Sequence, residues 1–223
     1  MKVGKMTVFR DRRDAGRKLA QKLLHYADRP DVTVFALPRG GVPVAYEVAL
    51  VLGAPLDIFI VRKLGLPGRE ELALGAIGSG GIRVLNSDVI RILNIPQEVI
   101  NIVAQRELQE LQRREQQYRG DRSASDVRGR TVILIDDGLA TGASMRAAVA
   151  GVRAQHPARI VVAVPTAARE VCDAFEFAVD EMVCVITPEP FYGVGKWYEE
   201  FAQIDDEEVR RLLEEANRQV LHR

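Results

Sequence analysis

The chain has 223 residues and a formal net charge of zero, because 31 Lys and Arg residues balance 31 Asp and Glu residues. Hydrophobic residues make up 47% and charged residues 28%, a composition that can fill a globular core and excludes disorder throughout. No run approaches the ~18 apolar residues of a membrane span. Residues 1–13 lack the apolar centre of a signal peptide. We therefore expect a cytoplasmic protein with no membrane partner, folded as one domain over residues 1–223.

The neutral charge also argues against general binding to nucleic acid, which needs an excess of basic residues on the surface. Cys172 and Cys184 lie 12 residues apart with no histidine nearby. Two cysteines are too few for a disulfide scaffold, and without histidines they do not form a zinc pattern. We expect both to be unpaired, buried small residues.

The first elements in chain order alternate between helix and strand. Residues 11–27 carry apolar side chains at helical spacing and predict an amphipathic helix. The apolar, β-branched run 32–37 predicts a strand buried on both faces. A helix over 42–53, ended by a glycine, and a second strand over 55–63 follow.

The next segment is glycine-rich and long for a connection. We expect a functional flap over about 62–85, in which 72–77 and 82–85 could pair as a hairpin. A short helix capped by Asn86 or Ser87 and a longer charged helix over 96–118 come next. Arginines on the longer helix are interpreted as a solvated face. They are Arg106, Arg113 and Arg114.

The second half of the chain alternates strands with helices. The predicted strands are 131–135, 158–167 and 181–187, the predicted helices are 145–155 and 168–175, and a last helix is capped near Asp205. This alternation predicts an α/β fold, an open and mainly parallel sheet with helices on both faces. Ligands bind beyond the carboxyl ends of such strands, so the loops after 32–37 and 131–135 are the candidate site.

The loop after the strand 131–135 carries the strongest chemical signal. Residues 135–144 read IDDGLATGAS, so two adjacent carboxylates leave a buried strand and small residues then run into a helix N-terminus. Free backbone N–H groups and the helix dipole favour a phosphate there. The carboxylates suit sugar hydroxyls or hydrated Mg²⁺. Phosphate, hydroxyls and metal together describe a phosphorylated ribose.

Competing phosphate-binding motifs do not account for this loop. A simple capped strand-to-helix turn would not explain two adjacent carboxylates. The chain has no G-x-x-x-x-G-K-[ST] motif, which disfavours a Walker-type nucleoside triphosphatase. The turn after 32–37 is not G-x-G-x-x-G, which disfavours a dinucleotide-binding fold.

Residues Val132–Ser144 resemble the binding signature of the type I phosphoribosyltransferases. The resemblance covers about residues 32–187 and implies that family's fold, with a core over about 28–187. It also implies a small hood from 188–223, with or without the N-terminal helix. The combination RGG, VRKLG, DDGLATGAS and PFYGVG looks like a group of predicted phosphoribosyltransferases whose acceptor is not generally assigned.

The resemblance implies that the acidic pair holds the ribose hydroxyls of phosphoribosyl pyrophosphate, that the following loop holds its 5′-phosphate, and that the loop at 38–43 faces the pyrophosphate. The implied substrate-binding residues are Asp136, Asp137, Gly138, Leu139, Ala140, Thr141, Gly142, Ala143, Ser144, Arg39, Gly40, Gly41, Arg62 and Lys63. The implied catalytic residues are Asp136, Asp137 and Arg39, and the two aspartates would hold Mg²⁺ through water. The family's strained cis peptide would be Arg39–Gly40. Arg62 and Lys63 could instead be ordinary surface charge.

Aromatic residues of the hood could stack on a planar acceptor or could simply pack the tail onto the core. They are Phe191, Tyr192 and Trp197. Some purine-specific members carry an aspartate base at the position of Ala140, so the alanine here argues against such a base.

The resemblance implies transfer of the 5-phosphoribosyl group of phosphoribosyl pyrophosphate to a nucleobase-like nitrogenous acceptor. Pyrophosphate would be released with the help of Mg²⁺, and a homodimer is expected by analogy. The alternative is a regulator that senses phosphoribosyl pyrophosphate and binds RNA or DNA without turnover. A hydrolytic or vestigial enzyme is a third hypothesis.

Overall fold

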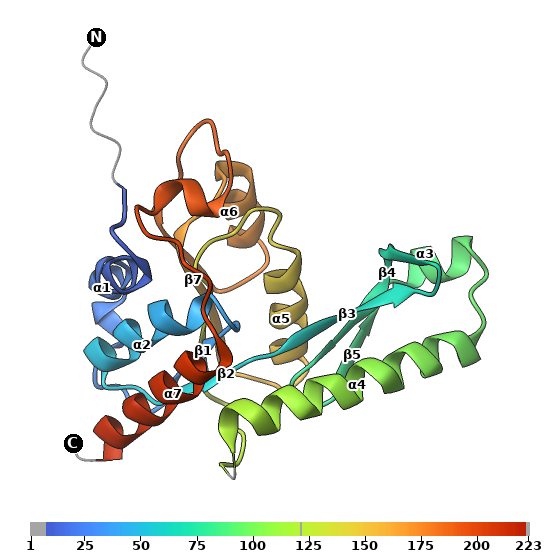
Figure 1. The fold of residues 1–223 in the computed structure, drawn as a ribbon, viewed down its shortest axis with the longest axis horizontal. Helices are drawn as coiled ribbons and strands as arrows, with labels where there is room; N and C mark the ends of the chain where they lie inside the picture. The colour runs from blue at the N-terminus through green and yellow to red at the C-terminus, as the bar shows by residue number, and fades with distance from the viewer. Residues whose placement is uncertain (1–7, 121, 222–223) are drawn as a thin grey trace.

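The computed structural model describes residues 8–120 and 122–221 and contains a five-stranded parallel sheet (Figure 1). The strand order is β2-β1-β6-β7-β8. The strands are β1 (Val32–Ala36), β2 (Leu56–Ile58), β6 (Thr131–Ile135), β7 (Arg159–Thr166) and β8 (Glu181–Ile186). The open parallel sheet predicted from the sequence is therefore confirmed.

The two central strands end at the same level. Every residue of β1 and β6 is buried, as expected for β-branched runs covered on both faces. Ala36 pairs in register with Ile135, the last residue of each strand. The loops that follow β1 and β6 therefore leave the sheet side by side.

Helices cover both faces of this sheet. Ile133 and Ile135 belong to a core shared with α1 (Arg12–Lys22), α2 (Gly41–Leu52) and α7 (Asp206–Leu221). Val132 and Leu134 face the other way, toward α5 (Ala143–Arg153) and α6 (Arg169–Glu176). The α1 helix is shorter than predicted, because a 3₁₀ turn, η1 (Leu24–Tyr26), follows it. None of the described helices is long and apolar enough to span a membrane.

A separate antiparallel sheet follows β2. It contains β3 (Val61–Leu66), β4 (Arg69–Gly78) and β5 (Ile82–Leu85). The predicted hairpin is confirmed, but the prediction of one strand over 55–63 is wrong. The chain divides between the two sheets there, since Phe59 N still donates to Ala36 O, whereas Ile60 N donates to Ser79 Oγ beside the new sheet.

The small sheet is packed on a helix rather than being an open loop. Its inner side chains Leu64, Leu74 and Ile77 are fully buried in the same core as Val103 of α4. The helices α3 (Ser87–Ile92) and α4 (Gln97–Arg119) follow the sheet, and Figure 1 shows α4 running along it. Asn86 caps α3, since its Oδ1 accepts from Val89 N. Closure of this segment over a ligand stays a prediction.

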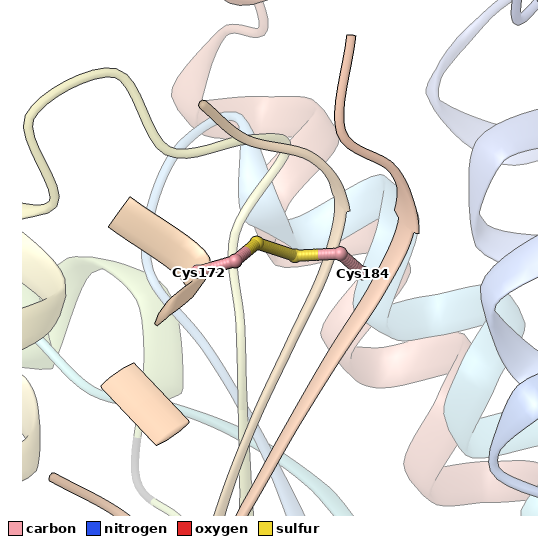
Figure 2. Close-up of a disulfide and its surroundings, with 2 residues drawn as sticks. All are labelled: Cys172 and Cys184. Atoms are coloured by element: carbon pink, nitrogen blue, oxygen red, sulfur yellow. A yellow bond between two sulfur atoms is a disulfide. The ribbon is translucent and has the colours of Figure 1, made fainter. Parts of the chain in front are cut away.

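The two cysteines form a disulfide, so the expectation that both are unpaired is wrong. Figure 2 shows the bond between Cys172 on α6 and Cys184 on β8. The helix lies against the strand that follows it, which brings the two sulfur atoms together across the interface between helix and sheet. Sequence spacing alone does not show which faces of the helix and strand meet.

Candidate active site

The loop after β1 contains a cis peptide, but between Pro38 and Arg39 rather than at the predicted Arg39–Gly40 bond. The reason is that Gly40 already has helical dihedral angles, with φ −61° and ψ −33°. Val42 N also donates to Arg39 O at 3.1 Å. The Arg39–Gly40 bond is therefore part of the start of α2.

The loops after β1 and β6 touch each other at two glycines. A Cβ atom at Gly40 would overlap with the carboxylate of Asp137. A Cβ at Gly41 would lie 2.6 Å from Ile135 O. Both positions exclude a side chain, because the acidic pair and the end of β6 occupy the space beside them.

Asp137 is held by the first helix of the chain. Arg12 Nε donates to Asp137 Oδ2 at 2.8 Å, and the side chains are only 9% and 15% exposed. Arg12 also donates to Ala202 O at 2.7 Å and lies 3.8 Å from the centre of the Phe201 ring. The Tyr198 hydroxyl donates to Asp137 O at 2.5 Å. Sequence reasoning missed Arg12, since nothing in its local pattern links it to a residue 125 positions later.

Asp136 accepts a hydrogen bond from Asp137 N at Oδ1, at 2.8 Å. Burial raises the pKa of Asp136 well above its ordinary value, and the negative charge of Asp137 raises it further. Burial also raises the pKa of Asp137, although Arg12 opposes this effect. The paired acids therefore favour a ligand that brings hydroxyl donors or positive charge to them.

Asp136 and Asp137 line different hollows. Asp136 lines a cavity of about 100 Å³ together with Pro38, Ser144 and Arg114 of α4. Asp137 lines a second hollow of about 380 Å³ with Arg12, Arg39, Gly40 and residues 201–204. Each acid of the predicted pair thus borders a hollow next to the two loops.

The rest of the predicted phosphate loop divides into a buried start and an exposed end. Gly138 and Leu139 are buried, and Leu139 N donates to Thr166 O, so this amide is not free for a ligand. Gly142 has φ +70° and precedes α5, which starts two residues before its predicted position. Exposed residues flank Gly142 on both sides. They are Ala140, Thr141, Ala143 and Ser144.

The two predicted flap cations have different surroundings. Arg62 Nη2 lies 2.7 Å from Glu107 Oε2 on α4, so Arg62 is already paired. Lys63 is 45% exposed and donates to Glu71 O at 3.0 Å. Lys63 also lines a cavity of about 500 Å³ between the small sheet and α5, which Ser144 and Arg146 share. Of the two, Lys63 has the more direct access to the phosphate loop.

Two of the three hood aromatics lie near the phosphate loop. Phe191 and Tyr192 line a hollow of about 600 Å³ with Ala140 and Thr141. Trp197, in the 3₁₀ turn η2 (Val194–Trp197), is only 3% exposed and belongs to a separate core cluster with Phe9, Ala15 and Tyr198. The structure does not bring Trp197 into this hollow, and its surroundings match the packing alternative.

The N-terminal segment is joined to the hood through its backbone. Phe9 N donates to Trp197 O, and Glu199 N donates to Phe9 O, both at 2.8 Å. Together with the Arg12 contacts, these bonds attach the start of the described chain to the segment that covers the site.

Comparisons with known proteins agree with this geometry. The sequence profile of the family described as "Phosphoribosyl transferase domain" matches residues 67–189, more than half of the chain. A crystal structure of TT1426 from Thermus thermophilus is 43% identical, with a TM-score of 0.82, and the match covers 93% of this chain and 98% of that one. The chain belongs to the phosphoribosyl transferase domain family, which confirms the resemblance.

Two Mycobacterium tuberculosis proteins are also similar. They are named Putative phosphoribosyl transferase MT0597 (strain CDC 1551 / Oshkosh) and Putative phosphoribosyl transferase Rv0571c (strain ATCC 25618 / H37Rv). Each is 46% identical over 213 residues, which is 96% of this chain and 48% of the relative. The chain therefore spans about half the length of these relatives.

Proposed function

We propose that the chain transfers the 5-phosphoribosyl group of phosphoribosyl pyrophosphate to a nucleobase-like nitrogenous acceptor and releases pyrophosphate. The observation that carries this proposal is the placement of Asp136 and Asp137 in hollows directly before the exposed loop end at the N-terminus of α5. A ribose 5-phosphate needs both features next to each other, hydroxyl acceptors for the ring and amides for the phosphate.

Donor binding is assigned to groups that the fold leaves accessible. The exposed residues Ala140, Thr141, Ala143 and Ser144 take the 5′-phosphate, two of them with their hydroxyls. Arg146, whose guanidinium donates to Thr141 O, adds positive charge beside this loop. Arg39 of the neighbouring loop faces the pyrophosphate, and Lys63 is a further cation at the edge of the site.

The donor set of the acidic pair fits Mg²⁺. This ion prefers oxygen ligands and is bound by one or two carboxylates while it keeps several waters and phosphate oxygens. Asp136 faces its hollow beside the pyrophosphate loop and would hold the ion, with Asp137 acting through water. When bound, Mg²⁺ neutralises part of the charge that develops on the leaving pyrophosphate.

Transfer forms a bond from the acceptor nitrogen to C1 of ribose while the C1–O bond to pyrophosphate breaks, and the nitrogen then loses its proton to solvent. Positive charge builds on the ring, as in glycoside cleavage. The acid pair anchors the ring hydroxyls, and Arg39 stabilises the departing oxygens. Phe191 and Tyr192 give the acceptor two aromatic faces beside residues 140 and 141, where a planar base can stack.

Calorimetric titration with phosphoribosyl pyrophosphate and Mg²⁺ tests the donor site. The double variant Asp136→Asn, Asp137→Asn is expected to lose binding, whereas Asp173→Asn, an exposed aspartate on α6, serves as the control. Unchanged binding in the double variant would refute the assignment. A screen of nucleobases and small amines that measures pyrophosphate release then identifies the acceptor. Binding without release in any reaction would favour the sensing regulator instead.

By analogy with paired α/β domains we also propose a homodimer. Sedimentation equilibrium measures this directly, and a mass equal to that of one chain at micromolar concentration would contradict it.

A further inference from the structure

Arg114 borders the candidate site, although the sequence pattern of its helix indicates a solvated face. The residue lines the cavity that Asp136 faces, together with Pro38 of the first loop and Ser144 of the second. The long helix α4 therefore delivers a guanidinium to the space between the two loops.

The guanidinium of Arg114 is available to a ligand. Its Nε atom donates to Glu110 Oε1 at 2.7 Å, and the side chain is 39% exposed. Within residues 8–120 and 122–221, its two terminal amino groups make no hydrogen bond. These amino groups are the ones that form paired hydrogen bonds to phosphate oxygens.

A second arginine, Arg39 of the loop after β1, lies near Asp206, as Tyr118 of α4 does. Arg39 Nη1 lies 3.8 Å from Oδ1 of Asp206, at the start of α7. Tyr118, one turn after Arg114, donates its hydroxyl to the same carboxylate at 2.6 Å. The Tyr118 hydrogen bond lowers the pKa of Asp206, and the charges of Arg39 and Arg114 lower it further. The carboxylate of Asp206 therefore lies near two arginines, Arg39 and Arg114, whose charges also suit a diphosphate.

The same helix explains why another cation is not free for this role. Glu107 pairs with Arg62 of the small sheet, with a side chain only 9% exposed. Arg114 follows Glu107 by seven residues, about two helical turns, so both lie on one side of α4. Glu107 pairs with the cation of the small sheet, whereas Arg114 places a cation beside the two loops.

We propose that Arg114 is a binding residue for the diphosphate of the donor and acts together with Arg39. This inference rests on the proposed function and adds a contact from α4 to it. The diphosphate gains negative charge as the C1–O bond breaks, so a guanidinium aimed at it stabilises the leaving group more strongly than the intact donor.

The experiment uses inorganic pyrophosphate with Mg²⁺ as the probe, titrated into the full chain by calorimetry. Arg114→Gln is expected to weaken binding about tenfold or more, the effect of losing a hydrogen bond to a charged group. The matched control is Arg113→Gln, because Arg113 also pairs with Glu110 but is 60% exposed and does not line the cavity. This control is expected to change binding less than about twofold. Arg114→Lys, which keeps the charge, is expected to recover part of the affinity.

A second variant is expected to strengthen pyrophosphate binding instead of weakening it. Asp206→Asn removes the resident carboxylate charge and is expected to tighten pyrophosphate binding about threefold or more. Equal affinities for Arg114→Gln and Arg113→Gln would overturn the inference, and so would unchanged binding in Asp206→Asn. If the unmodified chain binds phosphoribosyl pyrophosphate normally in that case, the proposed function survives. If it binds neither pyrophosphate nor phosphoribosyl pyrophosphate, both proposals fail.

Discussion

Arg12 and Asp137 form a nearly buried ion pair in which Nε and Oδ2 are 2.8 Å apart. The pair joins the first helix of the chain to the second carboxylate of the candidate site. The same guanidinium reaches Ala202 O in the segment before α7. The helix α1 is therefore part of the candidate site.

Replacing Arg12 is expected to destabilise the fold. Arg12→Met leaves a carboxylate uncompensated in a mostly buried position, so the free energy of unfolding should fall by about 3 kcal/mol. The control is Arg17→Met on the same helix, because Arg17 is 45% exposed and lies 3.3 Å from Glu47. That change should cost less than about 1 kcal/mol. Urea unfolding followed by circular dichroism measures both, and equal values for the two variants would contradict the prediction.

The acid pair is expected to lower the free energy of unfolding, although it is needed for ligand binding. Burial and the charge of Asp137 both disfavour the ionised form of Asp136, so Asp136→Asn should raise the free energy of unfolding at pH 7. Asparagine still offers an oxygen to Asp137 N. The same variant should lose binding of phosphoribosyl pyrophosphate. Urea unfolding and calorimetry check the two effects, with Asp173→Asn as the control. A less stable variant that still binds the donor would refute this account.

The hood aromatics are expected to affect the acceptor and not the donor. Tyr192 is 75% exposed at the hollow beside residues 140 and 141, so Tyr192→Ala should lower kcat/KM for the acceptor about tenfold through lost stacking. Binding of phosphoribosyl pyrophosphate should stay unchanged. Phe177→Ala is the matched control, since Phe177 is 93% exposed and does not line that hollow. Equal loss in both variants would argue that the aromatic surface serves another purpose.

A pH dependence is expected at Glu181, away from the candidate site. The Tyr26 hydroxyl donates to Glu181 Oε2 at 2.5 Å, and His25 Nε2 lies 3.2 Å from Oε1. Burial raises the pKa of Glu181, but these contacts outweigh burial and hold the pKa below its ordinary value of 4.5. A lowered folded-state pKa stabilises the fold above about pH 4.5, and this stabilisation is lost as the pH falls further.

Glu181→Gln should therefore be less stable than the unmodified chain at pH 7, and the difference should shrink below about pH 4.5. Urea unfolding at several pH values measures this. Glu176→Gln, at an exposed position on α6, should show no such trend. A difference for Glu181→Gln that grows toward low pH would have the wrong sign.

Local patterns in the sequence predicted the sheet and the position of the loop that we propose as the phosphate site. The runs 32–37 and 131–135 are apolar and β-branched, so their burial on both faces could be predicted without a structure. The acid pair and the glycines after it are adjacent in sequence, so the same short segment that forms the loop also shows its chemistry.

Contacts between distant segments could not be predicted in this way. Arg12 meets Asp137 and Arg114 meets the two loops only because α1 and α4 pack beside the carboxyl ends of the strands. On the sequence alone, both Arg113 and Arg114 belong to a charged helix, and only the packing of α4 distinguishes their surroundings. The disulfide is similar, because its formation depends on which side of α6 faces β8.

The disulfide between Cys172 and Cys184 also holds the edge strand β8 in the sheet. The β8 strand is at the edge of the parallel sheet, where unpaired backbone groups can recruit a strand from another molecule. The covalent link to α6 opposes local unfolding of β8, because the strand cannot detach from the sheet unless α6 moves with it. Under strongly reducing conditions we therefore expect self-association through β8 to begin before global unfolding.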